Sequence, residues 1–383
     1  MRSDVHTWKQ FKTGDNSLCT ELYVCYTHLP FFLIPERFVC MLLSPVRHFT
    51  FALLCFIVAV TGCIEVFSPE VSAPSSPPLV VEGTVVNGTG PHEVRLTRAA
   101  AFEQSLDGLV RGVSDASVTI TDTTIGRTVL LRETERSGMY RTEADELSGT
   151  PGSTYRLDIV LIDGTHYRST PQTMPPPVPI DSVTVAFDTS PTPGFSIGVE
   201  APEPAGEPNF YRWSVRATYE AAIFPEPRTP PFFCWADDSS SNMVPLREDL
   251  LIDGKRIVQE PVHFVPLTQK TSLGYQVDVR QQTLTTDAFA FWEAIKEQIE
   301  NTGDTFAPPP SPIRSNIRNL TDPSFAALGF FTAVGQTEAT VCVNPRDFPE
   351  APFPGTGRED DTCNGPRVSF QRPPYWVCSS ATN

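Results

Sequence analysis

Apolar and polar residues alternate over most of the chain after residue 78. Residues 93–98 illustrate the pattern, since Val94 and Leu96 fall on one face of an extended segment while Glu93 and Arg95 fall on the other. Such period-two alternation predicts β-strands that bury one face. A first group of strands is predicted at 79–86, 92–98, 113–122, 128–133, 138–141, 153–162 and 165–169.

Turn signals separate these segments. Asp163-Gly164 is a strong hairpin signal, because glycine accepts positive φ and aspartate bonds its own backbone. Strands of this length at spacings of about 8–12 residues are typical of an immunoglobulin-like or transthyretin-like sandwich. We therefore expect a first β-sandwich at 79–174.

A stiff linker, Met174-Pro-Pro-Pro-Val-Pro179, marks the boundary to a second module. Alternation resumes beyond it, with Tyr211, Trp213 and Val215 on one face. We expect a second, fibronectin-like β-sandwich at 180–383, with a long proline-rich insertion at 224–250. Its strands are predicted at 182–187, 195–199, 211–219, 329–334 and 339–343.

One amphipathic helix is predicted at 286–301. Thr285 or Thr286 caps it, and Gly303 follows as a stop signal. Phe289, Trp292, Ile295 and Ile299 repeat at helical spacing. We interpret this stripe as core packing, with a ligand groove as the alternative.

A short apolar run, 49–61, ends in the segment Val60-Thr61-Gly62-Cys63. It suits a signal-peptide core and is too short for a spanning helix, which needs about 20 residues. The ending matches a bacterial lipobox, so we expect acylation of Cys63, and several acyl chains anchor stably. The alternative is a buried core strand that contains a cysteine.

Residues 1–40 lie upstream of this signal and fit no targeting pattern. We interpret them as a mis-called extension, with translation from Met41, a signal peptide at 41–62 and a lipidated tether at 63–78. The alternative is a genuine leader before an internal signal. In either case we do not expect residues 1–62 to be part of the folded domains.

The composition limits the classes of partner that the protein is expected to bind. A net charge of −16 argues against nucleic acid and anionic lipid, because both require basic surfaces. Proline, at 38 of 383 residues, is about twice as frequent as usual. This proportion suits β-modules with rigid connections.

Four cysteines follow Cys63, namely Cys234, Cys342, Cys363 and Cys378. An even number in an exported chain is consistent with up to two disulfides. Three pairings are possible, and we slightly favour Cys363 with Cys378. No CxxC occurs, and the histidines after Cys63 lack ligand spacing, so neither a metal nor another cofactor is predicted.

No catalytic motif is present: there is no GxSxG, HExxH, P-loop or GxGxxG. Phe232, Phe233 and Trp235 in the insertion are a candidate platform for a sugar or peptide, with packing under the loop as the alternative. Asp237-Asp238 and Glu359-Asp360-Asp361 could hold calcium. Solvated loop charge is the simpler interpretation, and His166 is expected to be an exposed turn residue.

Several segments resemble, in order, the Bacteroidota lipoprotein family catalogued as domain of unknown function 4249. The resemblance implies an outer-membrane lipoprotein, commonly encoded beside a TonB-dependent receptor, and implies no catalytic residues. The tail from Cys363 to Cys378 departs from the family pattern. The segments include Cys63-Ile-Glu-Val-Phe67, Leu79-Val-Val-Glu-Gly83, Tyr211-Arg-Trp213, Cys234-Trp235 and, above all, Val279-Arg-Gln-Gln-Thr-Leu-Thr-Thr-Asp-Ala-Phe-Ala-Phe-Trp292.

These observations favour a non-enzymatic outer-membrane lipoprotein that binds substrate or docks on a TonB-dependent transporter. The lipid anchor, the spacer and two β-modules without a catalytic signature support this interpretation. Two alternatives stay open: a structural or adhesion module, and a surface hydrolase with an unrecognised carboxylate site.

Overall fold

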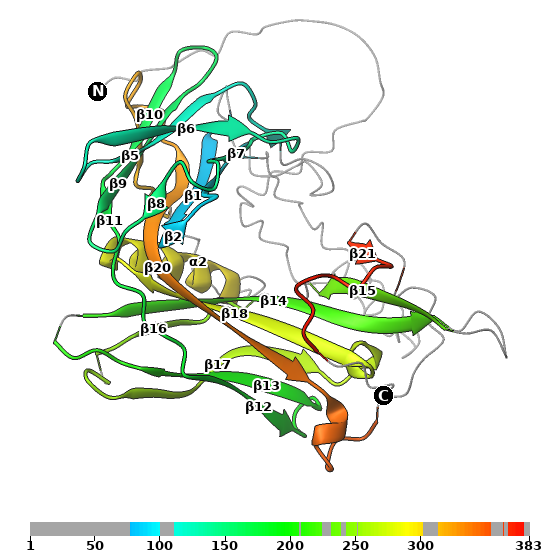
Figure 1. Cartoon of the computed structure of the whole chain (residues 1–383). Helices are drawn as coiled ribbons and strands as arrows, with labels where there is room; N and C mark the ends of the chain where they lie inside the picture. Colours follow the sequence, from blue (N-terminus) through cyan, green and yellow to red (C-terminus); the bar gives the residue numbers. More distant parts are fainter. Residues whose placement is uncertain are drawn as a thin grey trace, which may run out of the picture. The chain divides into compact units, whose positions relative to one another are not determined.

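β-strands make up most of the described chain (Figure 1). The computed structural model describes residues 77–99, 111–206, 208–223, 231–238, 243–250, 252–301, 313–353, 363 and 367–378. All of them lie in one compact unit, Val71–Asn383. The proposed extension, signal peptide, lipidation site Cys63 and most of the tether lie outside the described residues.

The strands before the linker match the predicted ones closely. The Asp163-Gly164 turn is confirmed, since Gly164 has a φ of 85° and Thr165 N donates to Asp163 Oδ1 at 2.9 Å. The elements are β1 (Leu79–Val86), β2 (Gly88–Thr89), β3 (Glu93–Arg98), β4 (Arg111–Gly112), β5 (Ser117–Asp122), β6 (Arg127–Glu133), β7 (Met139–Arg141), β8 (Ser148–Gly149), β9 (Thr154–Val160), β10 (His166–Ser169) and β11 (Gln172–Thr173).

The elements after the linker include long strands and one α-helix. They are β12 (Ser182–Asp188), β13 (Gly194–Pro202), β14 (Phe210–Ile223), β15 (Phe232–Asp238), β16 (Leu246–Glu248), β17 (Arg256–Pro266), the short 3-10 helix η1 (Gln269–Thr271), β18 (Gly274–Leu284), α2 (Thr286–Glu300), β19 (Ile317–Asn319), β20 (Leu328–Val343), η2 (Pro345–Asp347) and β21 (Val368–Ser369).

The prediction of a mainly β chain with one amphipathic helix is confirmed. Sixteen strands join in one mixed sheet. Thirteen follow the path β19-β10-β9-β5-β6-β7-β3-β1-β20-β18-β14-β15-β21, and β11, β16 and β4 pair beside it with β9, β14 and β3. A separate three-stranded sheet has the order β12-β13-β17. Strand pairing therefore connects the two expected modules through a single sheet.

Strand β20 makes that connection, and Figure 1 shows it running from beside β1 to beside β18. Its first part, 328–334, pairs in parallel with β1, and its second part, 335–343, pairs antiparallel with β18. The sequence predicted two strands here, at 329–334 and 339–343. One continuous strand replaces them, because the polar residues between them also pair in the ladder.

Two hydrophobic cores flank this connection. The first contains Val94, Leu96 and Ile120 together with Ile317 and Phe331, so β19 and the start of β20 complete the core that begins at residue 79. The second lies between the long strands β14, β18 and β20 and the three-stranded sheet, and it includes Tyr211 and Trp213. The linker at 174–179 therefore does not separate the residues of the first core from those of the second along the sequence, because Ile317 and Phe331 follow the linker and belong to the first core.

Gly335 marks the position where β20 changes partners. A Cβ at this residue would lie 2.4 Å from Pro177 N and 2.6 Å from Pro175 O. The backbone of the proline linker therefore packs directly against the strand. Thr337 Oγ1 and Gln281 Nε2 fix the linker further by donating to Val178 O at 2.7 and 2.9 Å.

Helix α2 begins as predicted. Thr285 is the N-cap, and its Oγ1 accepts from Ala288 N at 3.3 Å. Phe289 is buried and its ring lies 4.9 Å from that of Phe210, whereas Ile299 is 44% exposed. Only the first half of the predicted stripe is therefore core. Among the described residues, no helix combines the length and the apolar character needed to cross a membrane.

The disulfides correct the pairing that we slightly favoured. Cys234 pairs with Cys363, and Cys342 pairs with Cys378. Residues 368–369 form β21 against β15, which holds Cys363 beside Cys234. The tail then crosses to β20, where Cys378 meets Cys342, so Cys363 and Cys378 are fastened to different strands.

Candidate functional site

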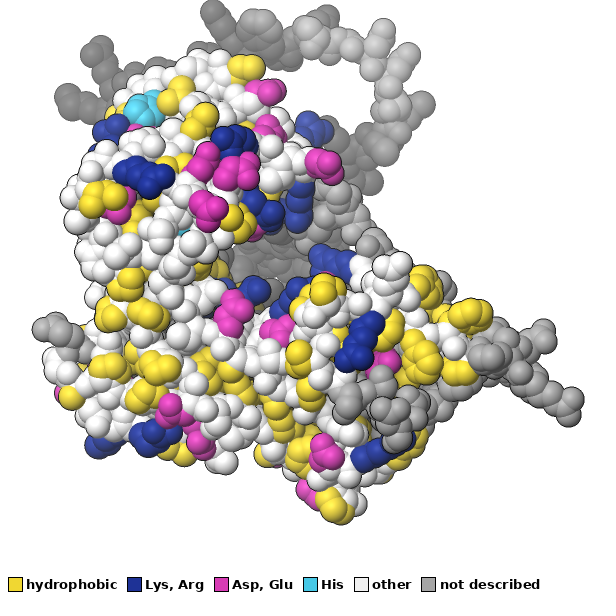
Figure 2. Space-filling view, in the orientation of Figure 1, with side chains coloured by type: hydrophobic (Ala, Val, Ile, Leu, Met, Phe, Trp, Pro, Cys, Tyr) yellow, Lys and Arg dark blue, Asp and Glu magenta, His cyan; other side chains and the backbone are white. Residues whose placement is uncertain are grey.

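A polar cleft opens between strands β1 and β3 on one side and β14, β18 and β20 on the other. Its volume is about 500 Å³. Figure 2 shows a hollow in this face of the molecule, with Lys/Arg and Asp/Glu side chains along its rim. The lining residues are Glu82, Thr84, Val86, Pro91, His92, Glu93, Arg95, Met139, Ser214, Arg280, Gln282, Gln336 and Glu338.

Strand alternation produces the floor of this cleft. Tyr211 and Trp213 of β14 point into the second core, so the intervening Arg212 and Ser214 point to the opposite face. The register aligns this polar face across three strands. Arg212 lies opposite Gln282, which lies opposite Gln336; Ser214 lies opposite Arg280, which lies opposite Glu338.

A chain of hydrogen bonds links these side chains. Arg212 Nη1 donates to Gln282 Oε1 at 2.8 Å, and Gln282 Nε2 donates to Gln336 Oε1 at 2.9 Å. Gln336 Nε2 and Arg280 Nε then donate to Glu338 Oε1 at 2.9 and 3.0 Å. A guanidinium can only donate. Arg212 therefore fixes which end of each amide faces its neighbour.

Arg212 is a cation held without a carboxylate partner among the described residues. Its guanidinium carbon lies 3.7 Å from the centroid of the Trp292 ring of α2, and no described residue offers its Nε a hydrogen-bond partner. Burial lowers the pKa of Arg212 to about 10. Helix α2 thus covers one end of the floor.

The C-terminal tail covers the other end. Arg216 stacks on the Tyr375 ring at 4.2 Å and donates to Tyr375 Oη at 2.7 Å. Gln276 Nε2 donates to Tyr375 O at 3.1 Å, while Val377 N donates to Gln276 Oε1 at 2.8 Å. Trp376 is buried beside them. The residues between the helix and the tail stay open as the floor.

Ion pairs line the facing wall. Arg95 Nη1 lies 3.6 Å from Glu82 Oε2, and Arg141 pairs with Glu93. His92 is buried there, its Nε2 lies 3.0 Å from Leu147 O, and burial lowers its pKa despite that contact. The carboxylates Glu82, Glu93 and Glu338 each have an arginine partner. Charges in the cleft are therefore largely compensated.

The aromatic platform predicted from the sequence is not brought together on one exposed surface. Phe232 is 58% exposed at the start of β15, whereas Trp235 is 9% exposed and packs with Trp376, Cys378 and Phe233. Packing describes Phe233 and Trp235 better than a platform does. Within the expected insertion 224–250, β15 and β16 both pair with β14.

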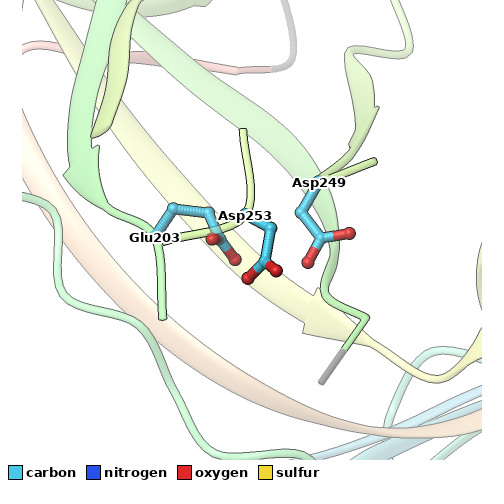
Figure 3. Close-up of side chains that lie close together, drawn as sticks. All are labelled: Glu203, Asp249 and Asp253. Carbon is cyan, nitrogen blue, oxygen red and sulfur yellow. The ribbon is translucent and has the colours of Figure 1, made fainter. Parts of the chain in front are cut away.

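Three carboxylates approach one another elsewhere, and Figure 3 shows Glu203, Asp249 and Asp253 converging. One oxygen from each lies within 4.8 Å of the others. Backbone donors already serve them: Gly254 N reaches Glu203 Oε2 at 2.6 Å, Asn209 N reaches Asp249 Oδ2 at 2.9 Å and Gly206 N reaches Asp253 Oδ1 at 2.8 Å. This cluster fastens the loops around Tyr211.

The acidic pair considered for calcium has partners in the protein. Asp237 accepts from Arg216 and Thr218, each at 3.2 Å. Asp238 accepts from Lys270 Nζ at 3.1 Å and Tyr275 Oη at 3.0 Å. These contacts place the pair in the side-chain network around β15. The other acidic candidates, residues 359–361, lie outside the described residues.

His166 is half-buried, with its Nε2 3.0 Å from Asp158 Oδ1. Asp158 also accepts from Arg156 at 3.0 Å and from Arg168 at 2.6 Å. The prediction that His166 is an exposed turn residue was therefore wrong. His166 begins β10, and the pairing of β10 with β9 brings it beside Asp158.

The floor residues Arg212, Arg280, Gln282, Gln336 and Glu338 were missed as a site by sequence reasoning. Their signal was present as the polar half of alternating strands, and two of the segments that carry the resemblance, Tyr211-Arg-Trp213 and the one that begins Val279-Arg-Gln-Gln282, contain three of them.

The comparison with protein families matches residues 64–340 to the model described as Domain of unknown function (DUF4249). The chain belongs to this family. The match covers well over half of the chain and includes the first core, most of the second core, both walls of the cleft and helix α2. It ends within β20, before Cys342 and the tail. No curated protein matches the sequence.

Proposed function

We propose that this DUF4249 member is a non-enzymatic binding protein that holds a polar ligand in the cleft described above. The observation that carries the proposal is the hydrogen-bonded floor, in which Arg212 orients Gln282 and Gln336. Pre-ordered polar side chains favour binding, because the entropy of fixing them is already lost before the ligand arrives. Their placement on long strands also makes the site rigid.

Binding is favoured over catalysis by the state of the carboxylates. A general acid or base is a titratable group within hydrogen-bond reach of the proton that it transfers. Glu82, Glu93 and Glu338 are the carboxylates of the cleft lining, and each engages an oxygen in an ion pair with arginine. We therefore assign them to shaping the cleft.

The proposed cellular location comes from the sequence. Acylation of Cys63 would anchor the chain in the outer membrane, and 63–78 would separate the two modules from the lipid surface. We further propose that the modules are sandwich-like and that the protein passes its ligand to a TonB-dependent transporter. The family resemblance and the lipobox-like ending Val60-Thr61-Gly62-Cys63 support this assignment.

Native mass spectrometry tests the binding. The acylated protein in detergent is incubated with separate pools of neutral oligosaccharides and of peptides. We expect the wild type to retain ligand and Arg280→Ala/Glu338→Ala to lose it. Removing both partners avoids leaving one charge unpaired. The matched control is Arg256→Ala/Asp181→Ala, which removes a 2.6 Å ion pair outside the cleft.

No retained ligand in either pool, or equal retention by the Arg280/Glu338 variant, would contradict binding in the cleft. The cellular location has its own test, a mild-detergent pull-down from outer membranes. A TonB-dependent receptor in stoichiometric amount, together with an acylated N-terminal Cys63 peptide, supports the anchor and the partner. An N-terminus at Met1 without acylation removes both.

A further inference from the structure

Two arginine–aromatic stacks flank the cleft lining on the face of β14 that carries Ser214, one stack on either side of that residue. Arg212 lies on Trp292 of α2, and Arg216 lies on Tyr375 of the tail. Both arginines point to the same face of β14, four positions apart, which corresponds to about 13 Å along a strand. Ser214 lies between them, beside Arg280 and Glu338.

The floor between the stacks carries paired donors and acceptors without surplus charge. Arg280 and Glu338 compensate each other, and Gln282 and Gln336 each offer an amide with both a donor and an acceptor. Groups of this kind suit hydroxyls, since each hydroxyl also donates and accepts. A charged ligand would gain less between the stacks, because Arg280 and Glu338 there already pair with each other and the Arg212 guanidinium is covered by Trp292.

The backbone of the floor is closed to a ligand. Strand β18 pairs with β14 on one side and with β20 on the other, so its amides and carbonyls belong to the ladders. A peptide that binds by adding a strand needs a free sheet edge. The interior position of β18 therefore leaves recognition to side chains.

Tyr375 adds an apolar surface at one end. Its ring rests on Arg216, the residue as a whole is 38% exposed, and the Cys342–Cys378 disulfide holds the tail nearby. An exposed ring next to planar polar groups is the combination that recognises a sugar ring, with its apolar C–H face and its polar hydroxyl rim.

We propose that the ligand of the cleft is a neutral oligosaccharide, which lies across Gln282, Gln336, Arg280 and Glu338 with one sugar ring against Tyr375. This inference rests on the proposed binding function and names its substrate class.

Calorimetry with the full exported chain carrying Cys63→Ser tests the inference. The probes are linear neutral hexasaccharides of glucose, xylose, mannose and arabinose, and a pool of hexapeptides. At least one sugar is expected to bind. Tyr375→Ala should weaken that binding about tenfold, as expected for the loss of an aromatic contact. The control is Phe370→Ala, which removes a 64% exposed tail aromatic from outside the floor.

The possible outcomes distinguish the proposed binding function from the inference that the ligand is an oligosaccharide. Floor-dependent binding of peptides without binding of any neutral sugar overturns the oligosaccharide inference and leaves the proposed function standing. Binding of neither class overturns both. Sugar binding that Tyr375→Ala and Phe370→Ala leave equally strong overturns the role of Tyr375 and the position of the sugar on this floor.

Discussion

The guanidinium carbon of Arg212 lies 3.7 Å from the centroid of the Trp292 ring, at the point where helix α2 meets the polar face of β14. Arg212 brings a positive charge to this place without a carboxylate partner among the described residues. Keeping such a cation half-buried costs stability. Arg212 also donates to Gln282, and this hydrogen bond orients the side chains of the cleft floor.

The first prediction separates those two effects. Arg212→Met keeps a long side chain against Trp292 and removes the buried charge. We expect the free energy of unfolding to stay the same or to rise by about 1 kcal/mol. Ligand retention in native mass spectrometry should fall, because Gln282 and Gln336 lose their fixed orientation. A large loss of stability, or unchanged retention, would contradict the assigned role.

Gly335 gives the second prediction. The Cβ of Gly335→Ala would meet the backbone of Pro177 at 2.4 Å, and neither β20 nor the linker can yield easily. We expect a loss of about 1–3 kcal/mol in the free energy of unfolding by urea denaturation. Thr340→Ala serves as control, since it removes one exposed hydrogen bond on the same strand. Equal effects of the two substitutions would show that the linker is not packed there.

The third prediction concerns the tail. Cys342→Ala/Cys378→Ala opens a loop of 36 residues, which lowers the free energy of unfolding by about 2–4 kcal/mol in the chain-entropy account. It should also make the tail sensitive to protease. Non-reducing peptide mapping of the wild type is expected to recover Cys342 linked to Cys378. A Cys363–Cys378 peptide would contradict the pairing.

The fourth prediction concerns pH. His263 is buried in β17, and neither of its ring nitrogens has a hydrogen-bond partner within the described part of the chain. Burial lowers its pKa, although Asp238 acts in the opposite direction. The unfolded chain therefore binds this proton more readily. Stability is full above the ordinary histidine value of 6.5 and falls as the pH drops through it.

His263→Leu should flatten the decline in thermal midpoint between about pH 7 and pH 5. Part of the decline should remain, because His92 is shifted in the same direction. Phe264→Leu is the matched control on β17 and should keep the wild-type slope. An unchanged slope in His263→Leu would place the titration elsewhere.

The sequence predicted the strands before the linker well, because alternation is local, whereas β15, β17 and β18 were not among the predicted strands. Tyr211 and Trp213 share a buried face as expected, and Thr285 caps the helix. It did not predict that Arg212, Gln282 and Gln336 would form one row. That row depends on the register between distant strands, which no local pattern specifies. The same limit applies to Cys378, whose partner is set by the path of the tail across the sheet.

The double role of β20 was also beyond local reasoning. Residues 335–338 interrupt the apolar alternation, so the segment reads as two strands. In the structure all four residues pair with β18; Gln336 and Glu338 face the cleft, whereas Gly335 and Thr337 face the proline linker. The irregularity in the pattern was thus a signal of the site, because floor residues replace the expected apolar ones.

The most direct measurement is a crystal structure of the full exported chain with the ligand retained from the pools. The account predicts ligand density between the two walls, in contact with Gln282, Gln336, Arg280 and Glu338 and reaching toward Tyr375. Density on another surface, such as the exposed Phe232 at the start of β15, would contradict the claim that this cleft is the binding site.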